Sequence, residues 1–257
     1  MTNRILWINP IGSSDFDQPI KEFLETGKNP DTEIKVVSLT KGPLYLEYHY
    51  YEALVLADTL HLVKRAEKEG YDAAVIGCFY DPGLREAREI TDRLVVMAPA
   101  QASMHIASTL GHKFSIIVGR KKWVPKMQEN VINYGFKDKL ASFKSVNLGV
   151  YEFQKDLSET ALRLQASARE AVEKDLAEVI ILGCTAQFGF YRELQEYIGV
   201  PVIDPILAAL KYTEFLVEVK KRFNWGHSKI YGFEGPPRDE IKSWKLKEQY
   251  GIKEIGS

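Results

Sequence analysis

AEKEGYDAAVIGC, residues 66–78, and VEKDLAEVIILGC, residues 172–184, are two stretches of the chain that align without a gap. Four of the thirteen aligned positions are identical, and each stretch reads as a helix end, a turn, an apolar strand and then Gly-Cys. The chain has two cysteines, Cys78 and Cys184, and the alignment pairs them. This repeat predicts two related halves that each place one thiol at the carboxyl end of a strand.

Short apolar strands alternate with longer amphipathic helices along most of the chain. This alternation is typical of a parallel sheet with helices on both faces. We therefore expect an α/β fold of two pseudo-symmetric subdomains, each a parallel sheet flanked by helices, with the active site in the cleft between them. The expected divisions are a first half at 1–100, a second half at 101–204, a helix at 205–223 that packs back on the first half, and a C-terminal extension at 224–257.

Composition narrows the class of protein. The chain has 257 residues, is 45% hydrophobic and 27% charged, and carries a formal net charge of −1, so no whole-protein field selects nucleic acid or a membrane as a partner. Its first residues, MTNRILWINPIG, lack the long apolar core of a signal peptide, and no apolar run reaches the roughly 18 residues of a membrane span. We expect a cytoplasmic protein that binds a small molecule.

The sequence lacks the common cofactor motifs. It contains neither GxGxxG nor GxxxxGK[ST], and its five histidines show no spacing typical of metal ligands. We therefore expect neither a cofactor nor a metal.

Two opposed thiols suit one reaction class. Ligands of a parallel α/β sheet collect beyond the carboxyl ends of its strands, where both cysteines are predicted to stand. Asp81 and Pro82 read as the N-cap and first residue of a helix, and amide groups there and after Cys184 are expected to lower the thiol pKa values. One thiolate can then remove a proton from a carbon acid while the opposite thiol returns a proton to the other face, which inverts the stereocentre without a cofactor.

A cysteine at a strand end is also a common packing residue, because it behaves as a small hydrophobe. The matched Gly-Cys pair favours catalysis over packing, but a disulfide switch stays open as an alternative. So does a non-enzyme, a ligand-binding or thiol redox-sensing protein that keeps the cleft.

CFYDPGLREARE, at 78–89, resembles the first cysteine motif of the hydantoin racemase branch of the aspartate/glutamate racemase superfamily. Other segments of that pattern occur in the expected order: INP at 8–10, GP at 42–43 followed by Glu47, MHIASTLGHKFSIIV at 104–118, LGCTAQ at 182–187 and GVPVIDPILAALK at 199–211. The resemblance covers about residues 1–220. It implies two α/β subdomains with one catalytic cysteine from each, and a homo-oligomer.

The resemblance also implies a set of site residues. Cys78 and Cys184 would be the acid/base pair, and the substrate pocket would be lined by residues at strand ends, namely Asn9, Phe79, Gly183, Thr185 and Ala186. The residues alone also permit structural roles, because Asn9 suits a turn, Phe79 a core and Thr185 a helix cap.

Departures from the branch bear on the substrate. Ile-Gly at 11–12 stands where the branch continues with Asn-Thr, so Ser13 or its neighbour is expected to supply the lost hydroxyl. Val118 and Gly119 replace two threonines, and Tyr80 fills a variable slot. We expect these residues to line a changed and more apolar pocket.

Two other stretches are predicted to serve structure rather than the substrate. The aromatic cluster YLEYHYYEA, at 45–53, precedes a long helix, which favours packing or a subunit interface over ligand stacking. The basic run GRKKW, at 119–123, reads as a solvated helix start.

These observations favour a cofactor-independent, two-cysteine racemase of 5-monosubstituted hydantoins or of a related carbonyl-activated stereocentre such as allantoin. Racemisation of free aspartate or glutamate is an alternative, supported by Gly-Cys-Thr at 183–185 but not by the residues around Cys78. A cysteine-based isomerase of the maleate type is a further alternative.

Overall fold

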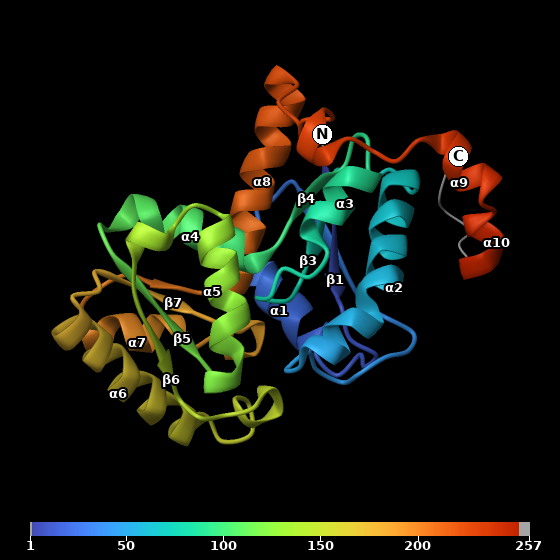
Figure 1. Ribbon diagram of the computed structural model, residues 1–257. Helices are drawn as coiled ribbons and strands as arrows, with labels where there is room; N and C mark the ends of the chain where they lie inside the picture. Colours follow the sequence, from blue (N-terminus) through green and yellow to red (C-terminus); the bar gives the residue numbers. More distant parts are fainter. Residues whose placement is uncertain (1, 252–257) are drawn as a thin grey trace.

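The computed structural model describes residues 2–251 and contains two parallel sheets of four strands each (Figure 1). The strand order of the first sheet is β2 (Thr32–Ser38), β1 (Asn3–Asn9), β3 (Ala73–Ile76) and β4 (Val95–Met97). The order of the second is β6 (Leu140–Ser145), β5 (Phe114–Val118), β7 (Val179–Leu182) and β8 (Val202–Ile203). Both sheets thus have one topology, and the predicted α/β fold of two helix-flanked parallel sheets is confirmed.

Helices follow the strands in both halves (Figure 1). They are α1 (Asp17–Gly27), α2 (His49–Lys68), α3 (Leu84–Ile90), α4 (Pro99–Leu110), α5 (Val124–Asn133), α6 (Leu157–Asp175), α7 (Tyr191–Ile198), α8 (Pro205–Phe223), α9 (Arg238–Ser243) and α10 (Leu246–Tyr250). None of these helices, all within residues 2–251, is long and apolar enough to cross a bilayer.

The strand β1 shows why its sheet is covered on both faces. Successive side chains of a strand point to opposite faces. Ile5 and Trp7 are buried in the cluster beneath α1 and α8, while Leu6 and Ile8 are buried in the cluster beneath α2 and α3. Because both faces of β1 are covered, its residues must be apolar without alternation, and the sequence of β1 shows this pattern.

The helix that follows the last strand of each sheet packs on the other sheet. α4 follows β4, yet Met104 and Ala107 of α4 are buried in the core of the second half. α8 follows β8, yet Ile206 and Leu210 of α8 are buried against the first sheet. This exchange of helices joins the two sheets into one body.

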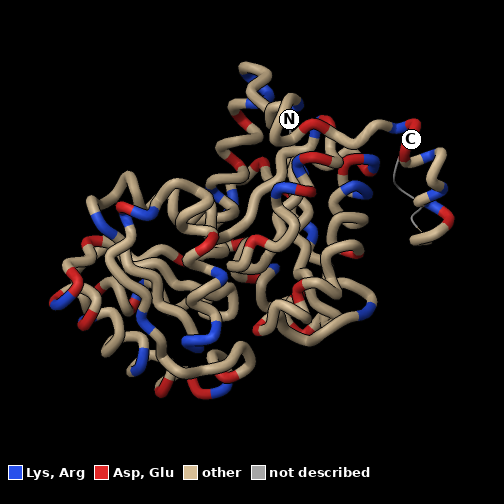
Figure 2. The backbone as a smooth tube through the Cα atoms, in the orientation of Figure 1, with Lys and Arg blue, Asp and Glu red and all other residues tan. Residues whose placement is uncertain are grey.

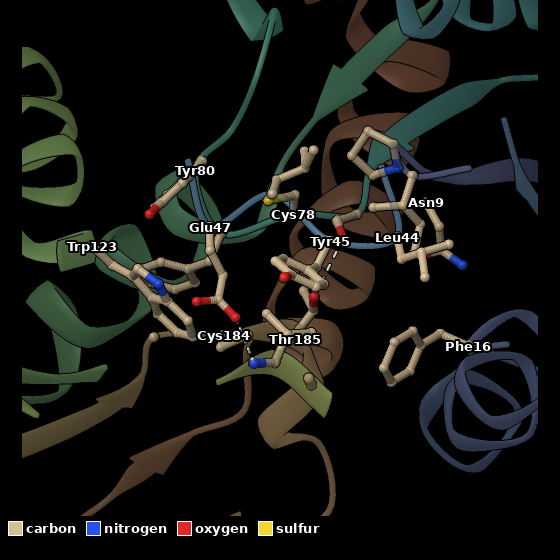
Figure 3. Close-up of a pocket in the computed structure, with 18 of the residues that line it drawn as sticks. Asn9, Phe16, Leu44, Tyr45, Glu47, Cys78, Tyr80, Trp123, Cys184 and Thr185 are labelled. Atoms are coloured by element: carbon tan, nitrogen blue, oxygen red, sulfur yellow. Dashed lines mark hydrogen bonds between the residues drawn. The ribbon is translucent and has the colours of Figure 1, made fainter. Parts of the chain in front are cut away.

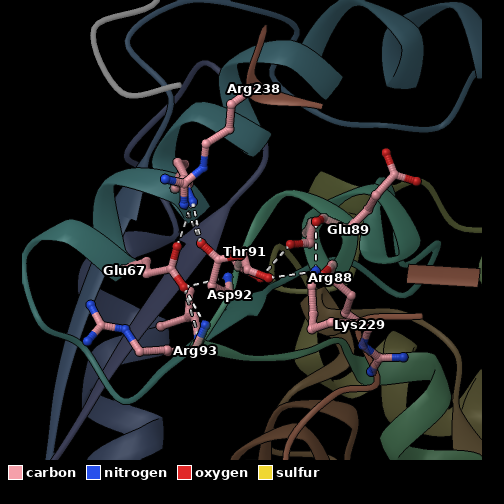
Figure 4. A network of polar contacts seen from close by, with 11 residues as sticks. Glu67, Arg88, Glu89, Thr91, Asp92, Arg93, Lys229 and Arg238 are labelled. Atoms are coloured by element: carbon pink, nitrogen blue, oxygen red, sulfur yellow. Dashed lines mark hydrogen bonds and ion pairs between the residues drawn. The ribbon is translucent and has the colours of Figure 1, made fainter. Parts of the chain in front are cut away.

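The C-terminal extension lies along the edge of the first sheet. Nε2 of His227 accepts a hydrogen bond from the backbone N–H of Val96 in the edge strand β4 at 2.9 Å. Nζ of Lys229 donates to the carbonyl oxygens of Arg88, Glu89 and Thr91 at the end of α3, at 2.8–2.9 Å (Figure 4). The described part of the extension thus covers backbone groups that the sheet edge and the helix end would leave unpaired; its residues 252–257 lie outside the described chain.

Charged residues of both signs are interspersed over both halves in Figure 2. This distribution agrees with the formal net charge of −1.

Candidate active site

The two Gly-Cys turns meet in one pocket between the halves. Cys78 follows β3 and Cys184 follows β7, both thiols are free, and both cysteines line the pocket (Figure 3). The backbone of the two turns matches, because the N–H of Gly77 donates to Ile8 O at 2.7 Å and that of Gly183 donates to Ile117 O at 2.8 Å. The two repeated sequences therefore adopt the same backbone geometry at their Gly-Cys turns.

The glycine before each cysteine is required by the neighbouring strand. A Cβ on Gly77 would lie 2.3 Å from Nε1 of Trp7 in β1. A Cβ on Gly183 would lie 2.9 Å from the carbonyl oxygen of Ile117 in β5. Each glycine thus lets its turn approach the central strand of its sheet, which fixes where the cysteine stands.

The turn after each cysteine also repeats. The N–H of Asp81 donates to Cys78 O at 2.9 Å, and the N–H of Gln187 donates to Cys184 O at 3.0 Å. The hydroxyl of Thr185 donates to Gly77 O at 3.4 Å, which links the two turns across the pocket.

Burial governs the acidity of both thiols. It raises the pKa of Cys184 to about 12 and that of Cys78 further, although the backbone N–H of Ala186 and that of Tyr80 oppose this by favouring the respective thiolates. The charge of Glu47 adds to the rise at Cys184, and the neighbouring Cys184 thiolate adds to the rise at Cys78. The amides thus lower the thiol pKa values as expected, but desolvation outweighs them, so the net shift of both pKa values is upward.

Asp81 does not start the helix after Cys78. It adopts φ of 50°, and α3 begins only beyond Pro82. Its carboxylate instead accepts from the backbone N–H groups of Ala100 and Gln101 in the first turn of α4, both at 2.9 Å, and from the Tyr134 hydroxyl at 2.9 Å. The predicted N-cap is therefore a cap of another helix, one that belongs to the core of the second half.

Comparison with known proteins identifies the family of the chain. Residues 5–213 match the family of Asp/Glu/hydantoin racemases. The chain belongs to this family. It is 40% identical over 215 residues to a hydantoin racemase of Paenarthrobacter aurescens, with 83% of this chain and 91% of the relative covered.

Two further relatives agree. A hydantoin racemase of a Pseudomonas species is 33% identical over 237 residues, which cover 92% of this chain and 93% of the relative. The structure of allantoin racemase from Klebsiella pneumoniae matches with a TM-score of 0.85 at 28% identity, over 92% of this chain and 94% of that one. The predicted hydantoin racemase branch and the isomerase class are thereby confirmed.

Most of the predicted site residues of this Asp/Glu/hydantoin racemase lie on the pocket. The lining includes both cysteines and Asn9, Phe79, Tyr80, Gly183, Thr185 and Ala186. The side chain of Asn9 is held in place, since its amide oxygen accepts from Nε1 of Trp7 at 2.9 Å and its amide nitrogen donates to Asp17 at 2.7 Å.

Three predicted residues do not line the pocket. Val118 is fully buried in the core of the second half, and Gly119 supports the ring of Trp123 instead of facing the cavity. The hydroxyl of Ser13 accepts from the backbone N–H of Asp15 at 3.2 Å. Strand position alone did not distinguish side chains directed into the cleft from those directed into the sheet's own core.

Other lining residues of this family member escaped the sequence reasoning. Glu47 lies on the pocket, although the motif Gly-Pro followed by Glu47 gave it no role, and Trp123 turns inward from the run that reads as solvated. Apolar walls come from residues such as Ile11, Phe16, Leu44, Tyr45, Leu46, Met127 and Val150. Within residues 2–251 no group of three or more His, Cys, Asp or Glu side chains is arranged to hold a metal ion.

Proposed function

We propose that the protein racemises 5-monosubstituted hydantoins, or a related neutral ring such as allantoin, with Cys78 and Cys184 as the two proton-transfer groups. The observation that carries the proposal is the pair of free thiols presented to one pocket by matched turns. The names of the relatives, hydantoin and allantoin racemases, support the substrate class.

In this mechanism one cysteine enters as thiolate and the other as thiol. The thiolate forms its S–H bond as the C–H bond at the stereocentre breaks, and the electron pair left on carbon is delocalised into the adjacent ring carbonyl. The opposite thiol then gives its proton to the other face of that carbon and becomes the thiolate. The two cysteines exchange roles when the other enantiomer binds.

The backbone supports whichever cysteine is charged. The N–H of Tyr80 and the N–H of Ala186 each favour the thiolate form of the cysteine two residues earlier. Such fixed donors need no reorganisation when the charge moves from one sulfur to the other.

The lining argues for a neutral ring over a free amino acid or a diacid. No Lys, Arg or His is among the described residues that line the pocket, whereas the carboxylate of Glu47 is. The guanidinium of Arg120 is already paired with Glu47 at 2.7 Å, so an amino-acid or maleate carboxylate would meet an apolar wall without a free cation in the lining. A hydantoin brings no such carboxylate.

The direct test is the decay of the circular dichroism of L- and D-5-benzylhydantoin with purified protein, corrected for the rate without enzyme. Decay to zero from both enantiomers is the expected result, with no change in parallel samples of L-aspartate and L-glutamate. Activity on the amino acids but not on the hydantoins would overturn the substrate assignment.

The raised thiol pKa values predict a steep pH profile. Burial raises the pKa of Cys184 to about 12 and that of Cys78 further, so the thiolate form is scarce at pH 7 and increases about tenfold for each pH unit. We expect kcat/KM for racemisation to rise by roughly 100-fold between pH 7 and pH 9, since kcat/KM reports the free enzyme. A flat profile over this range would mean that a thiolate is already formed at pH 7.

A further inference from the structure

Trp123, a residue of the pocket lining, carries an unpaired hydrogen-bond donor. Its side chain is 2% exposed and lines the pocket, and its indole Nε1 is buried with no hydrogen-bond partner among residues 2–251. A buried N–H without an acceptor is unfavourable, so an acceptor in the pocket would stabilise it.

Packing fixes the direction of this indole. Its six-membered ring lies on Gly119, where an added Cβ would be 2.4 Å from Cη2 and 2.6 Å from Cζ3. Phe153 packs edge-on against the same side chain, with ring centroids 6.3 Å apart. The N–H lies at the end of the indole remote from Cζ3, so the contact with Gly119 leaves it free for another partner.

Glu47 brings the complementary acceptor. Its side chain is 6% exposed, and its two oxygens are oriented by Arg120 Nη1 at 2.7 Å and by the N–H of Val150 at 3.1 Å. Figure 3 draws the Glu47 carboxylate and the indole of Trp123 among the residues that line the pocket. Each carboxylate oxygen has more than one acceptor site, so both can accept from a ligand while they keep these contacts.

We propose that Trp123 and Glu47 together bind the amide edge of the substrate ring. The indole N–H donates to a ring carbonyl oxygen, and the Glu47 carboxylate accepts from the ring N–H next to it. This assignment rests on the proposed racemisation of a neutral ring and adds the chemistry of its recognition. The site then selects cyclic compounds with an unsubstituted –NH–CO– unit.

The pair also explains the departure at Val118 and Gly119. Loss of two hydroxyl side chains there predicts a less polar pocket, but a side chain at 119 would occupy the space of the indole ring. Glycine at 119 therefore makes room for Trp123, whose indole N–H is the polar group of this wall.

The first test is the Trp123→Phe variant, which keeps an aromatic ring and removes the N–H. We expect kcat/KM for 5-benzylhydantoin to fall by about 10- to 100-fold, because a buried ring carbonyl loses its donor. Trp225→Phe is the matched control: Trp225 is 68% exposed and lies outside the pocket, so its kcat/KM should equal that of the wild type.

The second test uses N-methylated substrates and does not depend on how well a variant folds. The 1-methyl and 3-methyl derivatives of 5-benzylhydantoin are both assayed. For the derivative whose methyl group is on the nitrogen that faces Glu47, kcat/KM of the wild type should be at least about tenfold lower than for 5-benzylhydantoin. Glu47→Gln should reduce this discrimination, a readout that a purely structural role of Glu47 would not change.

The outcomes separate the two proposals. The recognition pair would be overturned, and the racemase left intact, if the wild type racemised both methylated forms as fast as 5-benzylhydantoin and Trp123→Phe were fully active. Wild-type protein that racemises no hydantoin would remove the proposed function and, with it, the pair.

Discussion

Cys78→Ser and Cys184→Ser are each expected to lower the racemisation of both hydantoin enantiomers by about 10³-fold or more. The two-base scheme needs a group on each face of the stereocentre, and a serine hydroxyl is far too weak an acid or base to replace a thiol. The measurement is the decay of circular dichroism for each enantiomer, with thermal unfolding of each variant to verify that it is folded.

Proton exchange in heavy water gives a sharper form of the same prediction. A variant with one thiol left can still remove the proton from the enantiomer whose C–H faces that thiol, and can return deuterium to the same face. Each variant should therefore catalyse exchange with one enantiomer, and the two variants should prefer opposite enantiomers. Full racemisation by either variant would falsify the two-base mechanism.

Asp81→Ala is expected to give a large loss of stability for the removal of one polar side chain. The Asp81 carboxylate accepts from Ala100 N, Gln101 N and Tyr134 Oη, each at 2.9 Å, and it is buried. Its removal leaves one buried and two part-buried donors without their acceptor, which costs about 3 kcal/mol in the free energy of unfolding.

Urea unfolding of Asp81→Ala beside Asp92→Ala measures this effect. Asp92 is an exposed carboxylate whose ion pairs with Arg238 and Lys64 are 3.6 and 3.8 Å long, so its loss should change the unfolding free energy by no more than about 1 kcal/mol. Equal midpoints for the two variants would show that the α4 terminus does not depend on Asp81.

The sequence predicted the features that depend on local geometry. Four identities sufficed to detect the repeat, because Gly77 and Gly183 are each required where a turn passes a neighbouring strand, and each precedes a cysteine on the pocket. The parallel sheets followed from the apolar strands in the same way.

Features that depend on residues far apart in the chain could not be predicted from the sequence. Glu47 is oriented by Arg120, 73 positions away, and Asp81 caps a helix that begins beyond the next strand. The amides near the cysteines are visible in the sequence, but the burial that outweighs them and raises both thiol pKa values is a property of the assembled pocket. The homo-oligomer stays a prediction.

The exchange of α4 and α8 sets the order in which the nascent chain can fold. The face of the first sheet that holds Ile5 and Trp7 is completed by Ile206 and Leu210, which are synthesised roughly a hundred residues after β4. At ribosomal speed this interval is about 5 to 20 s, during which α1 alone covers part of this apolar face and the part beneath α8 stays exposed. Burial of this face is therefore complete only after the second half has been synthesised. A chain that ends before residue 205 would keep the apolar surface exposed and would be prone to aggregate.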